Sequence, residues 1–215
     1  MVMHESRASR RAARRAELLE AADRVIRRLG PAAAMDDIAA EAGITKVVLY
    51  RHFGDKGGLY QALAERYVRA LLADLRAALA TPGEPRARLK ATIDAYVAFI
   101  ENHREAYDFL MHRAVKEGPA AQETVTDFMR GVAREAGEEL AEQLRALGLD
   151  PAPAQAWAHG AVGMVHLATD WWFDQHDLPR TWLVEHLVAL LWEGFAGLAA
   201  AAGVELATST GEGGS

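Results

Sequence analysis

The chain of 215 residues contains no cysteine, which excludes disulfide bonds and thiolate chemistry. No uncharged apolar stretch reaches the ~18 residues that a membrane-spanning helix needs, so we expect no membrane partner. The arginines between Arg7 and Arg15 are not followed by an apolar segment, so a secretory signal is not expected either. These absences favour a cytoplasmic protein.

Sequence motifs of common enzyme chemistries are also missing. There is no HExxH motif, no glycine-rich phosphate loop and no nucleophile elbow, so we expect no catalytic residues and no cofactor. The eight histidines leave a metal site open as an alternative, because His159 and His166 share a predicted helix face and His103 and His112 are near in sequence. A helical scaffold or interaction protein is a second alternative. Our primary expectation includes no metal.

The charge of the chain is divided unevenly between its two ends. The net charge is −6, which by itself argues against a nucleic-acid partner. Residues 1–60, however, hold 11 Lys and Arg against 8 Asp and Glu, whereas the remainder holds 13 against 22. The positive charge therefore gathers at the end where a DNA-binding segment would need it.

The most abundant residue types favour helix throughout the chain. Ala, Leu, Glu and Arg dominate, and alternating β-branched runs are missing, so the predicted class is all-α. Breaks at glycine and proline divide the chain. The predicted helices cover about 9–29, 36–42, 46–53, 57–80, 86–102, 104–116, 119–147, 152–175 and 180–202. The first is expected to carry an apolar stripe of Leu18, Ala22, Val25, Ile26 and Leu29, and the fourth one of Leu59, Leu63, Tyr67, Leu71 and Leu75. Thr45 is the expected N-cap of the third.

The predicted domain organisation has two parts and a tail. Residues 1–58 form a helix-turn-helix domain with a basic N-terminal arm, and residues 59–203 form a second helical domain. The Pro/Gly-rich stretch 81–85 is the clearest joint, although the long fourth helix ties the halves together. Residues 204–215 are low in complexity and are expected to be disordered.

Residues 36–60 carry the pattern of two short helices that meet at Gly43. Glycine suits such a turn because the residue that ends the first helix lies near the left-handed region. The side chains expected to pack beneath the first helix are Ile38, Ala39, Ala42, Ile44, Leu49 and Phe53. Those expected on the exposed face of the third helix are Thr45, Lys46, Val47, Tyr50, Arg51 and His52. This is a helix-turn-helix whose third helix can enter a major groove.

Here the sequence resembles the TetR-type repressor family. The resemblance covers Ile38-Ala-x-x-Ala42-Gly43-Ile44-Thr45, Leu49-Tyr50-Arg51-His52-Phe53-x-x-Lys56 and Leu59. It implies an all-helical homodimer that binds a double-stranded DNA operator, with a small-molecule effector in the C-terminal half. It also implies that Tyr50, His52 and Lys56 hold phosphates and that Thr45, Lys46 and Val47 face bases or backbone.

The chain departs from the family pattern at four places. The helix that begins near residue 36 is preceded by Ala34 instead of Ser or Thr, and Pro31 follows the glycine that ends the first helix. Val47-Val48 and Gly57-Gly58 replace small and acidic residues, respectively. The arginines from Arg7 to Arg15 are either a flexible arm on the DNA backbone or minor groove, or a solvated charged face.

The second domain is rich in large side chains at helical spacings. One interpretation is a filled core, and the other is an apolar pocket with a few polar groups, suited to an apolar or aromatic ligand. The candidate ligand-binding residues are Tyr96, Phe99, His103, Tyr107, Met111, Phe128, Trp157, Met164 and Trp171.

The last two predicted helices carry more apolar residues than one buried face requires. Gly160 and Gly163 lie in the interior of a helix, where glycine costs about 1 kcal/mol relative to alanine, so a packing reason is expected. A two-fold four-helix interface explains the surplus. Such a dimer sets two recognition helices about 34–36 Å apart, the spacing of successive major grooves.

Overall fold

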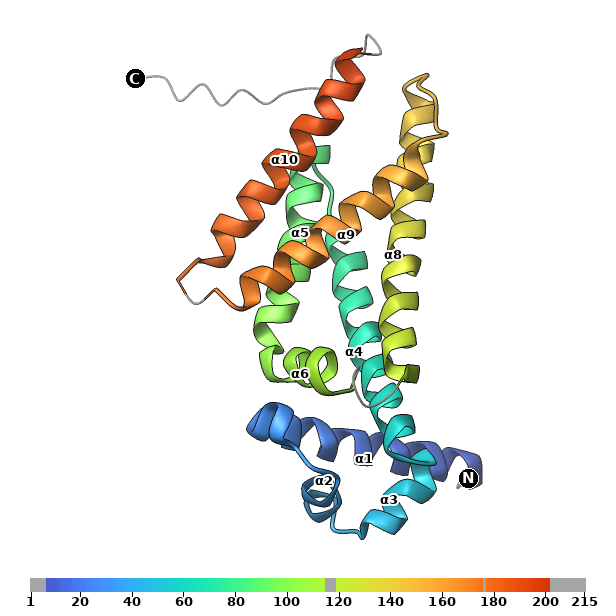
Figure 1. Ribbon diagram of the computed structural model, residues 1–215. Helices are drawn as coiled ribbons and strands as arrows, with labels where there is room; N and C mark the ends of the chain where they lie inside the picture. The colour runs from blue at the N-terminus through green and yellow to red at the C-terminus, as the bar shows by residue number, and fades with distance from the viewer. Residues whose placement is uncertain (1–6, 115–118, 176, 202–215) are drawn as a thin grey trace. The chain divides into compact units, whose positions relative to one another are not determined.

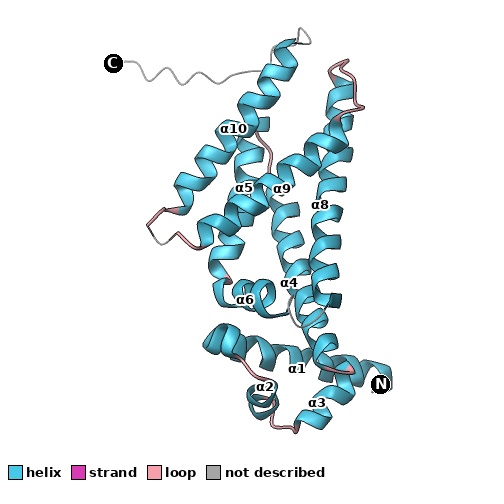
Figure 2. Ribbon diagram, viewed as in Figure 1, coloured by secondary structure: helices cyan, strands magenta, loops and turns pink. Residues whose placement is uncertain are grey.

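The computed structural model describes residues 7–114, 119–175 and 177–201, and every regular element among them is a helix (Figure 2). The predicted all-α class is confirmed. The tail expected to be disordered lies outside the described residues. No described helix combines the length and the apolar character that crossing a membrane requires.

The observed helices follow the predicted ranges closely (Figure 1). They are α1 (Arg7–Leu29), η1 (Gly30–Ala32), α2 (Met35–Glu41), α3 (Lys46–Phe53), α4 (Lys56–Leu79), α5 (Pro85–Asn102), α6 (Arg104–Asp108), η2 (Phe109–Ala114), α8 (Pro119–Ala146), α9 (Ala154–Phe173) and α10 (Arg180–Ala201).

One predicted helix differs from the structure. The range 104–116 was expected to be a single α-helix, but it consists of the short α6 followed by the π-helical η2. Apolar spacing over six residues cannot distinguish an i→i+4 from an i→i+5 hydrogen-bond pattern, so this change could not be predicted.

The described chain divides into two compact units. One contains residues 1–74 and 98–128, and the other contains residues 75–97 and 129–215. The divisions therefore fall inside α4, α5 and α8. The functional domain limits expected at residues 58 and 203 stay predictions.

The core of the first unit is built on one face of α1. Leu18, Ala22, Val25 and Ile26 are each at most 1% exposed, as the spacing predicted. Leu29 was expected on the same face but is 37% exposed, because α1 ends there and Gly30 turns the chain with a φ of 52°. On α4, the predicted face from Leu59 to Leu75 is buried, and Leu75 itself belongs to the second unit. Each fully buried Leu, Val or Ile side chain contributes roughly 1.5–3 kcal/mol to folding.

Polar contacts fix α1 against α2 and α4. Arg24 donates to Glu41 at 2.8 Å, and this hydrogen bond is the main cause of a lowered pKa for the Glu41 carboxyl. The buried Asp23 accepts a hydrogen bond from the Tyr67 hydroxyl and another from Arg27 at 2.9 Å. Burial and Asp23 together raise the pKa of Tyr67. These contacts hold the helix that supports α2 and α3.

The second unit contains α9, α10 and the parts of α5 and α8 assigned to it. The indole N–H of Trp172 donates to the carbonyl of Leu178 at 2.8 Å and closes the turn from α9 to α10. Gly137 of α8 lies so close to Gln155 of α9 that a Cβ would come within 2.6 Å of that side chain. These two contacts join α8 to α9 and α9 to α10.

Candidate nucleic-acid interface

The turn between α2 and α3 depends on Gly43. Its φ is 66°, its N–H donates to the carbonyl of Ala40 at 3.0 Å, and the N–H of Ile44 donates to that of Ala39 at 3.0 Å. These bonds satisfy carbonyls that the end of α2 leaves without helical partners. The predicted two-helix turn is therefore present, and only a residue that tolerates positive φ fits it well.

The start of α2 lacks the side-chain cap that is usual in the family. Ala34 occupies the capping position and has no side-chain acceptor. Asp37 compensates in part, because its carboxylate accepts a hydrogen bond from the Ala34 N–H at 2.9 Å. Its charge also lies in the first turn, where the helix dipole favours an anion. The departure at residue 34 thus leaves α2 intact.

The helix α3 presents one face to its unit and one to solvent. Leu49 and Phe53 are buried, whereas Thr45, Val47 and Arg51 are exposed, with Val47 at 78%. The remaining predicted DNA contacts are half-buried: Lys46, Tyr50, His52 and Lys56. The Val48 N–H donates to the Thr45 hydroxyl at 3.4 Å, so Thr45 is the N-cap that the sequence predicted.

Lys46 makes a contact that the sequence analysis did not anticipate. Its ammonium lies 3.2 Å from the Asp36 carboxylate; the Lys46 side chain is 43% exposed and that of Asp36 75%. An exposed ion pair of this kind contributes at most about 1 kcal/mol and weakens in salt. A phosphate or base edge can therefore replace Asp36 as the partner of Lys46.

The start of α4 is capped by Asp55, which is not among the residues predicted from the sequence. The Asp55 carboxylate accepts from the Gly58 N–H at 2.8 Å. An Asp placed directly before the helix was the available signal. The Gly57-Gly58 departure also has a local reason, since a Cβ on Gly58 would lie 1.9 Å from the Phe53 carbonyl oxygen. Lys56 occupies the first position of α4 and lies 5.5 Å from the Tyr60 ring centroid.

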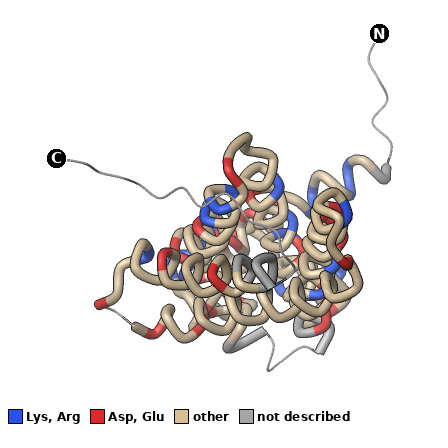
Figure 3. Tube along the Cα trace, turned by 90° about the horizontal axis from the view of Figure 1, so that it is seen from above, with Lys and Arg blue, Asp and Glu red and all other residues tan. Residues whose placement is uncertain are grey.

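The basic N-terminal segment is helical from Arg7 onward and is not a flexible arm over residues 7–15. The flexible-arm expectation was wrong for this stretch, because Ala and Arg are strong helix formers and continue the helix of the core. The Arg15 guanidinium lies 4.9 Å from the Phe53 ring centroid, at the end of α3. In Figure 3, blue Lys and Arg segments recur along the helix that leaves the grey N-terminal trace.

Positive charge around His52 is strong enough to affect its titration. Partial burial lowers the pKa of His52, and Arg51, Arg11 and Arg14 lower it further. Cations of α1 and α3 therefore act on the same imidazole. An exposed α3 beyond a two-helix turn, surrounded by cations, defines a helix-turn-helix DNA-binding protein.

Two family profiles match the chain. "Bacterial regulatory proteins, tetR family" matches residues 18–63, and "Tetracyclin repressor-like, C-terminal domain" matches residues 74–207. The chain belongs to the TetR family of transcriptional regulators.

Relatives agree with this assignment. An uncharacterized HTH-type transcriptional regulator of Mycobacterium tuberculosis is 31% identical over 191 residues, which cover 88% of this chain and 80% of that protein. The HTH-type transcriptional activator FasR of Mycolicibacterium smegmatis is 35% identical over 187 residues, covering 85% and 83%. A TetR-family regulator of Streptomyces coelicolor shares the fold at a TM-score of 0.69 and 23% identity, covering 88% and 83%.

The candidate ligand-binding residues are divided between the two units. In the first unit, Phe99 stacks on His103 at 4.2 Å between ring centroids, and Phe99 and Tyr107 are buried. Met111 and Phe128, also of this unit, are half-buried. The structure therefore brings part of the predicted set together as an aromatic cluster.

The other candidates lie in the second unit. Tyr96 is buried and shares a hydrogen bond of 2.8 Å with Nδ1 of His166. Burial raises the pKa of Tyr96 and lowers that of His166. Trp157 and Met164 are half-buried, whereas Trp171 is 50% exposed. Trp171 therefore presents much of its ring to solvent in the single chain.

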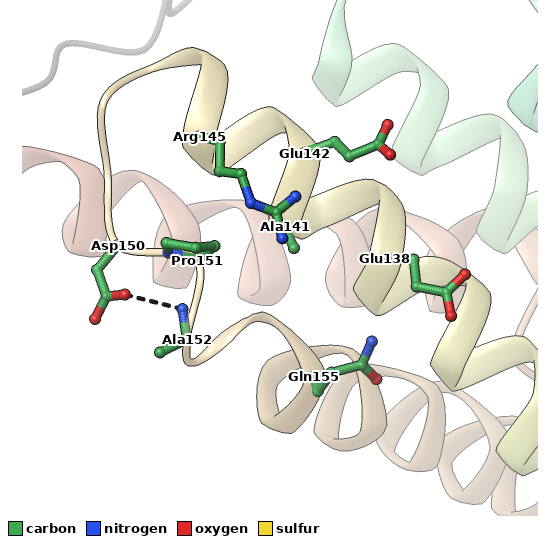
Figure 4. A pocket seen from close by; sticks show the side chains of 8 residues that line it. All are labelled: Glu138, Ala141, Glu142, Arg145, Asp150, Pro151, Ala152 and Gln155. Carbon is green, nitrogen blue, oxygen red and sulfur yellow. Dashed lines mark hydrogen bonds between the residues drawn. The ribbon is translucent and has the colours of Figure 1, made fainter.

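A hollow of about 520 Å³ lies at the turn from α8 to α9 (Figure 4). It is lined by Glu138, Ala141, Glu142, Arg145, Asp150, Pro151, Ala152 and Gln155. Asp150 is engaged locally, accepting from the Ala152 N–H at 3.0 Å. None of the candidate ligand-binding residues lines this hollow.

The histidine alternative finds no geometric support among the residues that the structure describes. There, no three His, Asp or Glu side chains gather in a way that could hold a metal ion. The Nδ1 atom of His159 instead contacts the carbonyl of Gln155 at 2.7 Å. His166 is directed to Tyr96.

Proposed function

We propose that the protein is a ligand-responsive transcriptional repressor of the cytoplasm that binds a palindromic operator as a homodimer. The observation that carries the proposal is the exposed face of α3, where Thr45, Val47 and Arg51 reach solvent while Leu49 and Phe53 anchor the helix from beneath. A helix held in this way can enter a major groove without losing its core contacts.

The proposed contacts follow from the chemistry of each side chain. Thr45, Lys46 and Val47, at the N-terminal end of α3, face base edges or the adjacent backbone. Tyr50, His52 and Lys56 bind phosphates. Arg51 is exposed and can make a bidentate contact with guanine or bind a phosphate.

The proposed dimer uses α9 and α10. Leu167 is 68% exposed and Leu190 is 62% exposed, and Trp171 and Trp182 also present large apolar areas. A Cβ added at Gly160, Gly163 or Gly194 would meet no atom within 4 Å, so no close contact among the described residues explains these glycines. A second copy packed on these helices would bury the apolar side chains and use the space at the glycines.

The proposed effector is a small apolar or aromatic molecule bound in the C-terminal half of the chain. Within the second unit, the buried Tyr96 and its partner His166 offer it a polar group. Release requires that the effector bind more tightly to the form of the protein that does not fit DNA. The difference in binding free energy between the two forms must reach several kcal/mol if most of the protein is to change state.

Activation is the second candidate. The relative FasR is named a transcriptional activator, and it is 35% identical to this chain. Repression and activation use the same DNA contact and differ in where the operator lies relative to the promoter. A reporter driven by the promoter of the bound operator separates them: deleting the protein raises expression under repression and lowers it under activation.

The test of DNA binding is fluorescence anisotropy with duplexes tiled across the DNA that flanks the protein's own gene. We expect tight binding to one palindromic duplex and at least tenfold weaker binding by Arg51→Ala, since each lost bidentate base contact costs about 1–3 kcal/mol and a dimer loses two. Arg69→Ala, which removes an exposed arginine of α4, is the matched control. If the purified protein binds no duplex at moderate salt, with or without candidate effectors, the proposal fails.

A further inference from the structure

One face of α1 changes its character along the helix. From Leu18 toward the C-terminus, this face is buried at Leu18, Ala22 and Val25. Arg11, Arg14 and Arg15 precede Leu18 by seven, four and three residues, the spacings that return to the same face of an α-helix. The face that packs against its own unit therefore continues N-terminally as an arginine surface.

The position of this surface is fixed by its contact with α3. Arg15 lies over the ring of Phe53, the last residue of α3. Arg11 and Arg14 lie near enough to His52 to affect its titration together with Arg51. The arginine surface of α1 is thus continuous with the C-terminal end of the proposed recognition helix.

The charge on this surface is poorly balanced within the chain. Residues 7–16 contain five arginines and no acidic residue, and Arg10 and Arg11 are exposed. The nearest carboxylate along the helix is Glu17, which pairs with Arg14 at 2.6 Å. Like charges four residues apart, as at Arg10 and Arg14, destabilise a helix. A polyanion that binds there would relieve this repulsion.

We propose that Arg10, Arg11, Arg14 and Arg15 form a second phosphate-binding surface, which binds the DNA backbone next to the phosphates that α3 contacts. The partner is duplex DNA because the surface continues the cationic end of α3. This inference rests on the proposed function of α3. It adds a rigid helical contact to the recognition helix, so the footprint on each half-site extends beyond the bases that α3 reads.

The salt dependence of binding tests this surface. Each phosphate contact that is lost lowers the slope of log K against log[salt] by about 0.9. In Arg11→Gln/Arg14→Gln a dimer loses up to four such contacts, so we expect the slope to fall by about 2–4 and the affinity in low salt to fall at least tenfold. Glutamine keeps the helix propensity of arginine, so α1 should persist.

The matched control is Arg69→Gln/Arg86→Gln, which removes the same charge from exposed positions of α4 and α5. We expect this control to keep the wild-type slope. We also expect Arg11→Gln/Arg14→Gln to lose affinity equally for operator and random duplexes, because phosphate contacts carry no sequence information. A wild-type slope in the α1 variant, with operator binding intact, overturns the inference while leaving the proposed function standing.

A second measurement locates the contact. Operator phosphates are replaced singly by neutral methylphosphonates, and binding is compared for wild type and for Arg10→Gln, which removes an exposed side chain with no role in the core. The inference is supported if neutralising certain phosphates weakens binding of wild type but not of Arg10→Gln. These phosphates should lie next to those whose neutralisation no longer affects Lys56→Gln. Identical maps for wild type and Arg10→Gln refute the α1 surface and leave the proposed function standing. Failure of wild type to bind any duplex, with or without binding to anionic vesicles, refutes the proposed function and the α1 surface together.

Discussion

Leu167 provides a direct test of the proposed dimer. The side chain projects from α9 and is 68% exposed in the single chain, so substitution should leave the fold of one subunit nearly unchanged. Leu167→Gln replaces it with a polar side chain of similar size. If α9 and α10 form the interface, the dimer buries the apolar area of Leu167 that is exposed in the monomer. The substitution removes this apolar area, so it weakens the dimer.

The size of the effect follows from that exposure. Complete burial of a leucine side chain stabilises by about 1.5–3 kcal/mol. The exposed 68% of Leu167 corresponds to roughly 1–2 kcal/mol per copy. A two-fold interface contains the residue twice, so the dimer loses about 2–4 kcal/mol and its dissociation constant rises roughly 30- to 900-fold.

Sedimentation equilibrium over a range of protein concentrations measures this constant. Leu147→Gln is the control, because Leu147 is 49% exposed and lies just beyond α8, outside both α9 and α10. We expect wild type and control to dimerise alike and Leu167→Gln to dissociate at far higher concentrations. A wild-type constant for Leu167→Gln, or a wild-type protein that is monomeric throughout, refutes the reasoning about α9 and α10.

Three further predictions concern the helix-turn-helix. Gly43→Ala should lower the free energy of unfolding by about 1–2 kcal/mol, because alanine disfavours a φ of 66°; an unchanged denaturant midpoint would contradict this. Asp55→Ala should cost about 0.5–2 kcal/mol in the same assay through loss of the cap on α4, while Asp55→Asn should retain most of the stability. DNA affinity should rise as the pH falls from about 8 to 6, since burial and nearby arginines lower the pKa of His52 in the unbound protein and a phosphate would raise it. His52→Gln should flatten that part of the profile, and an equally steep profile in the variant would argue against a phosphate contact.

Much of the fold could be predicted because helix boundaries depend on local chemistry. Gly43 and Thr45 marked the turn and the start of α3, and the structure confirms both roles. The prediction for Leu29 was wrong, since helical spacing does not show where the chain leaves the core. The candidate phosphate contacts could be named from the motif, but the arginines of α1 could not be placed beside His52 without the tertiary structure.

The sequence by itself determined the helical class, the limits of most helices and the helix-turn-helix, because propensity, capping and apolar spacing act between residues close along the chain. The tertiary structure alone decided which cations share a surface. It placed Arg15 over Phe53, brought Arg11 and Arg14 near His52 and left Leu167 exposed. Such proximities depend on how helices distant in sequence pack against one another, and no local pattern records them.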